Sequence, residues 1–405
     1  MYVSGGREMR ESIWKEVDEI REYVVDARHF VHRNAEVGFN EHATTAFIKK
    51  KLEAAGVEMI PLAIETGVLG IIRGTAEWTG AGEAPTIGLR ADIDALPIEE
   101  ATGAPYASQN KGIMHACGHD GHTAILLATA KVLQKNRNEF AGTVKLFFQP
   151  AEETLYGAAK MIECGVLENP SVDAVVALHG GVEVPLGSVA VYPGPFMASG
   201  DIFKVKMVGK GTHGAYPHRG SDAVAAAAQA VISLQMILAR EIEANERAVL
   251  SVCQIHGGNA FNVVPQEVEI AGTVRCFSPE VRSKIRERLE SICAHIAASY
   301  RCEAICDYTF GIPPVVNDTE ETDLLAEAAR DVLGSENVIR LANPMMGSED
   351  FAYFLQKVPR GTIFRLGVAG DTPVSLHNPG FNFPDEALPV GVAVFVSYVM
   401  EKLTR

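Results

Sequence analysis

The strongest constraint on the fold is a regular alternation of short strand-like runs and longer helical runs in the first half of the chain. The strand-like runs are GVLGIIRG, TIGLRADID, TVKLFFQP and DAVVALHG, and the helical runs among them include TAILLATAKVLQKN and GAAKMIECGVL. Strands that alternate with helices in this way form a largely parallel sheet with helices on its faces. We therefore predict an α/β fold with a mostly parallel central sheet.

Helical periodicity precedes this region. Apolar residues recur every three or four positions from Ile13 to Val31, which predicts one amphipathic helix. A second helix is expected from about His42 to Ala55, because Gly56 is a good C-terminal stop. Both helices are predicted to come before the first strand of the sheet.

The pattern changes between about Gly200 and Phe310. This stretch is predicted to run strand, helix, strand, strand, helix, strand, the order of a ferredoxin-like α+β module. Helix and strand signals resume after the hinge-like segment GIPPVVND, so the module is predicted to be an insertion. The predicted division is a catalytic domain in two parts, 1–195 and 312–405, and an inserted domain over 196–311.

Charge and cysteine content exclude several functional classes. The formal net charge is -15 and Lys and Arg form no cluster, which argues against a nucleic-acid partner. The N-terminus has no apolar run of signal-peptide length, and no window of membrane-spanning length is free of charge, so no membrane association is expected. The seven cysteines are scattered without a dense framework, which is typical of reduced thiols in the cytoplasm.

The segment HACGHDGH, residues 115–122, is the first candidate metal site. Cys117 and His119 are two positions apart, so in an extended or turning segment they project to the same side. A thiolate and an imidazole together suit zinc or another borderline divalent metal. Read alone, the segment is also compatible with an ordinary helix start, since polar residues are common there.

Two further candidates stand at the ends of predicted strands. Glu152 and Glu153 follow TVKLFFQP, and His179 follows DAVVAL. A pair of adjacent glutamates is by itself usually a solvated turn, but ligands of open α/β sheets gather at the carboxyl ends of the strands. One carboxylate could bind a metal while the other acts as general base.

His377 lies in SLHNPGFNFPDEAL, a loop rich in Pro and Gly near the end of the chain. A loop histidine means little alone, because loops expose histidine freely. Upstream, RADIDALP places Asp92 and Asp94 at the end of another predicted strand. A carboxylate there could bind a metal or orient a histidine ligand.

Seven motifs in order carry a resemblance to a known family. They are RADIDALP, MHACGHDGH, FQPAEE, GTHGAYPH, NVVPQEVEIAGTVR, GSEDFAYF and LHNPGF. Together they resemble the metallo-aminoacylase and carboxypeptidase superfamily. The branch is the one that contains hippurate hydrolase, N-acyl-L-amino acid amidohydrolases and plant indoleacetyl-amino acid hydrolases. The resemblance runs over nearly the whole chain.

The resemblance implies a dinuclear metal site for zinc, manganese, nickel or cobalt. Its implied ligands are Cys117, His119, Glu153, His179 and His377. Cys117 stands where other branches use an aspartate. Glu152 would be the general base and Asp94 would orient ligands from behind. Asp92 stands where other branches place a histidine ligand, and we do not predict it to be a ligand here.

The resemblance also assigns residues of the inserted domain. His213 of GTHGAYPH would stabilise the oxyanion, reaching the partner subunit's site in dimeric relatives. Asn262 and Arg275 match positions near the substrate carboxylate. The inserted domain would serve as lid and dimerisation surface, and a homodimer or homotetramer is expected. From the residues alone, each of the three could equally be a polar residue on a strand or turn.

The implied function is hydrolysis of N-acyl-L-amino acids, hippurate-like or N-acetylated, to a carboxylic acid and a free amino acid. The nearest alternative is a dipeptidase or carboxypeptidase of the same superfamily. A catalytically silent small-molecule binder on the same scaffold is a second alternative. A structural metal site is a third, but structural zinc usually takes close-set Cys or His ligands, and these candidates are spread over most of the chain.

Overall fold

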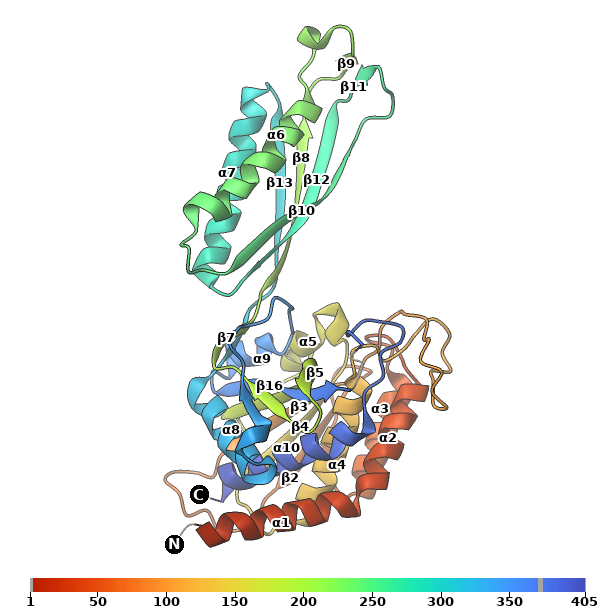
Figure 1. The fold of residues 1–405 in the computed structure, drawn as a ribbon, viewed down its shortest axis with the longest axis vertical. Coiled ribbons are helices and arrows are strands. Elements are labelled where there is room, and N and C mark those ends of the chain that lie inside the picture. The colour runs from red at the N-terminus through yellow and green to blue at the C-terminus, as the bar shows by residue number, and fades with distance from the viewer. Residues whose placement is uncertain (1–2, 371–373, 405) are drawn as a thin grey trace. The chain divides into compact units, whose positions relative to one another are not determined.

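The computed structural model describes residues 3–370 and 374–404. The chain forms two compact units (Figure 1). The large unit contains Met1–Gly194, Val316–Asn343 and Tyr353–Arg405, and the small unit contains Pro195–Val315 and Pro344–Ala352. The short segment Pro344–Ala352 thus makes its contacts with the small unit, although it follows the chain's return to the large one.

The large unit is built on one eight-stranded sheet. Its strand order is β1-β2-β4-β3-β5-β16-β6-β15. The pairs β3/β4, β3/β5, β5/β16 and β6/β15 are parallel, while β1/β2, β2/β4 and β6/β16 are antiparallel. The strands are β1 (Glu58–Ile60), β2 (Val68–Arg73), β3 (Thr86–Asp92), β4 (Thr143–Gln149), β5 (Ala174–Pro185), β6 (Val189–Val191), β15 (Val338–Arg340) and β16 (Gly361–Ala369). The predicted α/β fold with a mostly parallel sheet is confirmed.

Helices of the large unit cover this sheet. They are α1 (Val3–Glu19), α2 (Arg21–Arg33), α3 (His42–Ala54), α4 (His119–Lys135), α5 (Gly157–Glu163), α8 (Thr319–Leu333), α9 (Ala352–Lys357) and α10 (Leu388–Leu403). Every residue of β3 is buried, as expected for a central strand covered on both faces. The helices α4 and α10 are buried over most of their circumference, because each packs against the sheet and against other helices.

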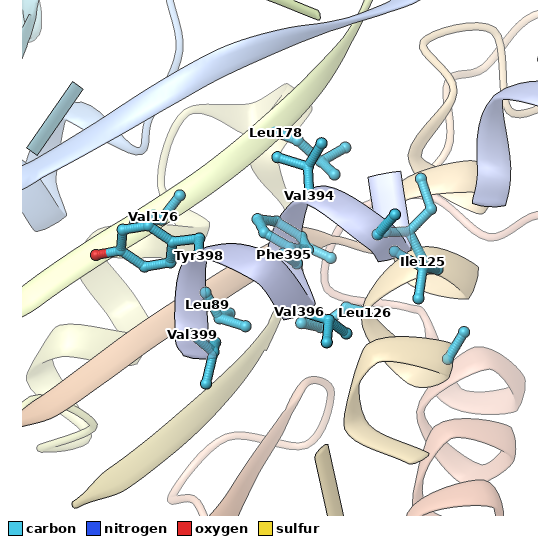
Figure 2. Packing of buried hydrophobic residues seen from close by; sticks show 14 of the residues in the cluster. Leu89, Ile125, Leu126, Val176, Leu178, Val394, Phe395, Val396, Tyr398 and Val399 are labelled. Carbon is cyan, nitrogen blue, oxygen red and sulfur yellow. The ribbon is translucent and has the colours of Figure 1, made fainter. Parts of the chain in front are cut away.

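The core of the large unit is continuous between the sheet and these helices. Figure 2 shows Leu89 of β3 and Val176 of β5 with Phe395 and Val396 of α10 and Leu126 of α4. Burying one such side chain contributes about 1.5–3 kcal/mol, so this layer fixes the positions of the strand ends described below.

The N-terminal helical region departs from the sequence prediction. The periodicity predicts one helix from Ile13 to Val31, but α1 ends at Glu19 and α2 begins at Arg21. Ile20 has left the helical region, with φ -110° and ψ 12°. Apolar periodicity could not reveal this break, because Val17 and Val24 on either side are both buried in the same core. The helix predicted from about His42 to Ala55 is α3, which ends at Ala54. Gly56, just beyond it, has a φ of +74°.

The small unit consists of a four-stranded antiparallel sheet with two helices. In chain order its main elements are β8 (Gly200–Val208), α6 (Ala223–Met236), β10 (Ala248–Gly257), β12 (Glu267–Cys276), α7 (Pro279–Ser299) and β13 (Glu303–Ile312). The sheet order is β10-β12-β8-β13, which is a ferredoxin-like arrangement. The chain passes between the units through β7 (Gly194–Met197) and β14 (Val315–Asn317).

Among the described residues, one helical stretch is long and apolar enough to cross a membrane by length and composition, Ala223–Glu241. It includes α6, whose residues Ala226, Ala230 and Leu234 are fully buried in the core of the small unit. Packing against the small sheet accounts for this buried face, while Val224, Ile232 and Met236 of the same helix are exposed.

Candidate metal centre

The candidate residues meet at one end of the large sheet, where β3 and β4 end beside the middle of β5. Parallel pairing sets Asp92, the last residue of β3, opposite Gln149, the last residue of β4. The next strand, β5, runs parallel to β3 and carries His179. The carboxyl ends of β3 and β4 therefore lie beside His179, and α4 begins at the same place with His119.

Cys117 lies between two of the histidines. Its Sγ is 3.5 Å from Nε2 of His179 and 3.3 Å from Nε2 of His377. Ligand atoms of Cys117, His119 and His179 lie within 4.8 Å of one another, and so do those of Cys117, Glu153 and His377. The two groups share the thiol, so this one residue could contact cations at two neighbouring positions.

The donor set fits a metal for a second reason. Nε2 of His119 and Oε1 of Glu153 are buried and have no hydrogen-bond partner, although such atoms are almost always paired in proteins. They lie 4.0 Å apart, and Oε1 of Glu153 is 3.4 Å from Nε2 of His377. Thiolate, imidazole and carboxylate converging on unpartnered atoms are the ligand chemistry of borderline divalent metals.

Protons would compete with a cation for two residues of this cluster. Burial raises the pKa of Cys117 to about 12, so the thiol keeps its proton in the cation-free protein. Burial alone would lower the pKa of His119, but the charge of Asp92 and the hydrogen bond with Asp94 outweigh it and hold that pKa well above its usual range. Groups that need nearby positive charge to ionise are the ones a bound cation deprotonates.

Two aspartates hold these residues from behind. Asp94 Oδ1 is 3.2 Å from Nδ1 of His119, and its Oδ2 accepts a hydrogen bond of 3.0 Å from the backbone N–H of Glu153. Asp94 thus links two of the candidate ligands, as an orienting residue would. Asp92 Oδ1 pairs with Nδ1 of His122 at 2.6 Å, and Nε2 of His122 accepts from the N–H of Gly180, next to His179.

His122 was not singled out in the sequence, although a signal existed. It follows His119 by three positions on α4, so the two rings share one face of the helix. Because the N–H of Gly180 donates to Nε2 of His122, the proton of that imidazole belongs on Nδ1, facing Asp92. This pair fixes the backbone beside His179.

Glu152 and Glu153 occupy a single 3-10 turn, Glu152–Thr154, with an unusual backbone. The residues on either side, Ala151 and Leu155, have φ of +55° and +63°, a region that L-residues seldom adopt. The buried carboxylate of Glu41 accepts a hydrogen bond of 2.8 Å from the N–H of Ala151. A residue far away in the sequence, which sequence reasoning missed, thus supports this turn.

Glu152 is 6% exposed and lies beside the cluster. Its carboxylate and the ligand atoms of His119 and Glu153 lie within 4.8 Å of one another. A carboxylate at this distance can exchange a proton with a water molecule that contacts the cluster.

The remaining candidates belong to the small unit. His213 of β9 (Thr212–His213) pairs with Val263 of β11 (Val263–Val264), and the N–H of Gly214 donates to the carbonyl of Asn262 at 2.7 Å. His213 and Asn262 are exposed and lie on this short ribbon. Arg275 lies instead on β12, where its guanidinium donates to the hydroxyl of Ser348. The structure therefore places His213 with Asn262, and Arg275 in another part of the unit.

Comparison with known proteins gives consistent matches over most of the chain. The profile of peptidase family M20/M25/M40 matches residues 88–401. N-acetyl-L-cysteine deacetylase of Bacillus subtilis (strain 168) is 42% identical, over 91% of this chain and 85% of that protein. IAA-amino acid hydrolase ILR1-like 2 of Arabidopsis thaliana is 39% identical, over 96% of this chain and 88% of that protein.

A solved structure agrees with these matches. A Bacillus subtilis protein described as a dinuclear metal binding peptidase from the M20 family superposes with a TM-score of 0.82 at 34% identity. The alignment covers 95% of this chain and 98% of that one. The likeness therefore includes both units and not the central sheet alone.

Proposed function

Since the chain belongs to peptidase family M20/M25/M40 and is a hydrolase of its amidohydrolase branch, we propose that it cleaves N-acyl-L-amino acids to a carboxylic acid and a free amino acid. The observation that carries the proposal is the thiol of Cys117, set between His179 and His377 at the strand ends. The deacetylase and the IAA-amino acid hydrolase both align along almost the full chain, which supports an acylated substrate.

We propose that two divalent ions are held by five residues of the large unit: Cys117, His119, Glu153, His179 and His377. Cys117 belongs to both candidate groups and would bridge the ions. Bound there, the ions would polarise the substrate carbonyl and acidify a water molecule. Zinc, manganese, nickel and cobalt all accept this mixed donor set, and availability in the cell decides among them.

Glu152 is the proposed general base. It takes a proton from the attacking water as the water's oxygen bonds to the amide carbon. When the carbon–nitrogen bond breaks, the same carboxyl returns the proton to the leaving amine, so the amino acid departs uncharged at nitrogen. Asp94 has a positioning role in this scheme, because it holds both His119 and the backbone of Glu153.

The small unit is proposed to act as lid and dimerisation surface. His213 would donate to the oxyanion, and Asn262 and Arg275 would bind the substrate carboxylate. The edge strand β10 of the small sheet exposes Val249 and Ile255, and an edge with apolar side chains can pair with a second copy. These features support a homodimer, or a homotetramer built from it, in which the small units meet.

The cysteines support a reducing compartment. All seven are free thiols, including Cys253 at the surface. We therefore propose a cytoplasmic enzyme whose partner is a small N-acyl amino acid, with no role for nucleic acid or membrane.

The experiment that tests the function is amino acid release from N-acetyl, N-benzoyl, indoleacetyl and longer N-acyl amino acids and from unblocked dipeptides. The protein is first stripped of metal and then reloaded with one metal at a time. Metal-restored release from acylated substrates is the expected result, and the ranking would identify the acyl group. Release from dipeptides alone would instead make the protein a dipeptidase. No release with any metal would favour a silent binding protein.

A further inference from the structure

A buried arginine in α2 joins two segments that carry candidate metal ligands. Arg28 is fully buried, and its Nε donates to Oδ2 of Asp120 at 2.9 Å. Its Nη1 donates to Oδ1 of Asp385 at 2.7 Å, and its Nη2 donates to the side-chain oxygen of Asn382. Each nitrogen of this guanidinium thus contacts the start of α4 or the C-terminal loop, and Nη1 also donates to the hydroxyl of Tyr106 at 3.2 Å.

Both ends of this bridge lie close to proposed ligands in the sequence. Asp120 follows His119 directly in the first turn of α4. Asn382 belongs to the same loop as His377, whose backbone N–H donates to the carbonyl of Ala116 at 2.8 Å. Arg28 therefore spans from the Cys117–His119 segment to the segment that supplies His377.

The loop also packs on the start of α4. A Cβ added at Gly118 or Gly121 would lie 2.8 Å from the ring of Phe383, so the loop fits against the helix with no space for a side chain. Gly118 has a φ of +89°, which further favours glycine there. Such close packing leaves the loop little room to move along the helix. Arg28 contacts the loop at Asn382 and Asp385, just before α10 begins at Leu388.

The bridge contains more than one pair. Asp385 also pairs with His29 through Oδ2 at 2.9 Å, and Asp120 pairs with His32 at 2.8 Å. Arg28 and Asp120 are both fully buried, so removing the cation would leave a buried carboxylate with less compensation. A planar guanidinium supplies donors in fixed directions to two segments at once, which the single ammonium of lysine cannot do.

We propose that Arg28 is a positioning residue that holds the His377 loop against the Cys117–His119 segment and thereby sets the affinity of the ion that uses His377. The inference rests on the proposed ligand set. The group Cys117, Glu153 and His377 needs the loop in place, whereas the group Cys117, His119 and His179 comes from the strand ends and α4. Loosening the loop should therefore weaken one ion much more than the other.

The test measures Zn²⁺ binding to the full-length, metal-stripped protein by competition with a chromophoric chelator. The variants are Arg28→Lys, which keeps the charge, and Asp385→Asn, which alters only the loop end of the bridge. Asp385 is 31% exposed at its side chain, so this second variant keeps the buried Arg28–Asp120 pair and guards against failure to fold. The matched control is Arg21→Lys in the same helix, whose side chain pairs with Asp18 at the surface.

Wild type and Arg21→Lys are expected to bind two ions. Arg28→Lys and Asp385→Asn should bind one ion normally and the other about 10–100-fold more weakly, the usual effect of losing a residue that supports a ligand. His377→Ala should weaken the same ion and leave little further effect for Asp385→Asn. Two unchanged affinities, or an equal loss of both, in folded variants would overturn the inference. A wild-type protein that binds fewer than two ions would instead refute the proposed metal site.

Discussion

The two units present their candidate residues in opposite ways. In the large unit, Cys117, His119 and His179 are buried, and Asp94 ties His119 to the turn that carries Glu153. In the small unit, His213 and Asn262 stand exposed on a two-stranded ribbon. The first set is organised by packing inside its own unit. A role for the second set would require that a substrate or another surface meet it.

The two units therefore differ in how much conformational freedom their candidate residues lose when a ligand binds. Residues held by a folded core lose little freedom when a metal or substrate binds, so they can act with fixed geometry. Exposed residues of a separate unit must be ordered during binding, and part of their interaction energy offsets that cost. Variants in the two units should therefore fail in different ways.

The largest effect is expected for Glu152→Gln in the large unit. Glutamine keeps the size of the side chain but cannot accept the proton of water, so kcat should fall by about 10³–10⁴-fold. Binding of two metal ions should persist, because Glu152 is not among the five proposed ligands. Steady-state kinetics and metal analysis of the same sample provide the check. A kcat within tenfold of wild type would remove Glu152 from the mechanism.

The next effect is expected for Cys117→Ala. Removing a thiol shared by both candidate groups should weaken both ions by more than about 100-fold, in contrast to the selective loss predicted for Arg28. Chelator competition measures the affinities. The control is Cys164→Ala, a partly exposed cysteine of the same unit. Normal affinity in Cys117→Ala would show that the thiol is structural.

A smaller effect is expected for His213→Ala in the small unit. Loss of one oxyanion donor should lower kcat by about 100-fold, while metal content and thermal stability stay at wild-type values, since the side chain is exposed. His218→Ala, a neighbouring exposed histidine, serves as the control. If His213→Ala lost metal or stability, the contrast between the two units would fail.

The smallest effect concerns the stability of the turn around Glu152. Burial raises the pKa of Glu41 to about 7 from 4.5, and the nearby charge of Asp94 adds to the shift. The folded protein then holds an extra proton between these two values, so its stability falls as pH rises from 4.5 to 7 and stays low above it. Glu41→Gln keeps an acceptor for the N–H of Ala151 and carries no charge.

In metal-free protein, the free energy of unfolding of Glu41→Gln should therefore exceed that of wild type by roughly 1–3 kcal/mol at pH 8. This difference should disappear as the pH is lowered toward about 5. Urea unfolding at several pH values measures it, with Glu53→Gln on the exposed face of α3 as control. Parallel stability curves for wild type and Glu41→Gln would mean that Glu41 is ionised in the fold at little cost.

The sequence predicted most of the architecture because strand and helix periods are local signals. The parallel sheet follows from the alternation of β3, α4, β4 and β5, and the candidate ligands follow from motifs at strand ends. The break at Ile20 was not predictable, since both flanking helices bury the same kind of residue.

Supporting residues were harder to predict. Glu41 serves a turn that lies far along the chain, and Arg28 serves a loop near the C-terminus. Their side-chain types are ordinary in their own segments, and their roles depend on which segments the fold brings together. A sequence pattern identifies a candidate metal ligand more readily than the residue that holds it in place. The ligand can be recognised from its side-chain type, whereas the supporting residue can be recognised only from its contacts in the folded chain.

The order in which the ligands occur along the chain has a consequence for biosynthesis. Cys117, His119, Glu153 and His179 all precede the small unit, whereas His377 follows it. The first four leave the ribosome before the small unit does, but β16 and α10, which pack against β5 and complete the core behind these residues, follow the small unit as His377 does. Both proposed cation positions would therefore depend on segments that follow the small unit, and a product that stops before β16 is expected to hold neither ion.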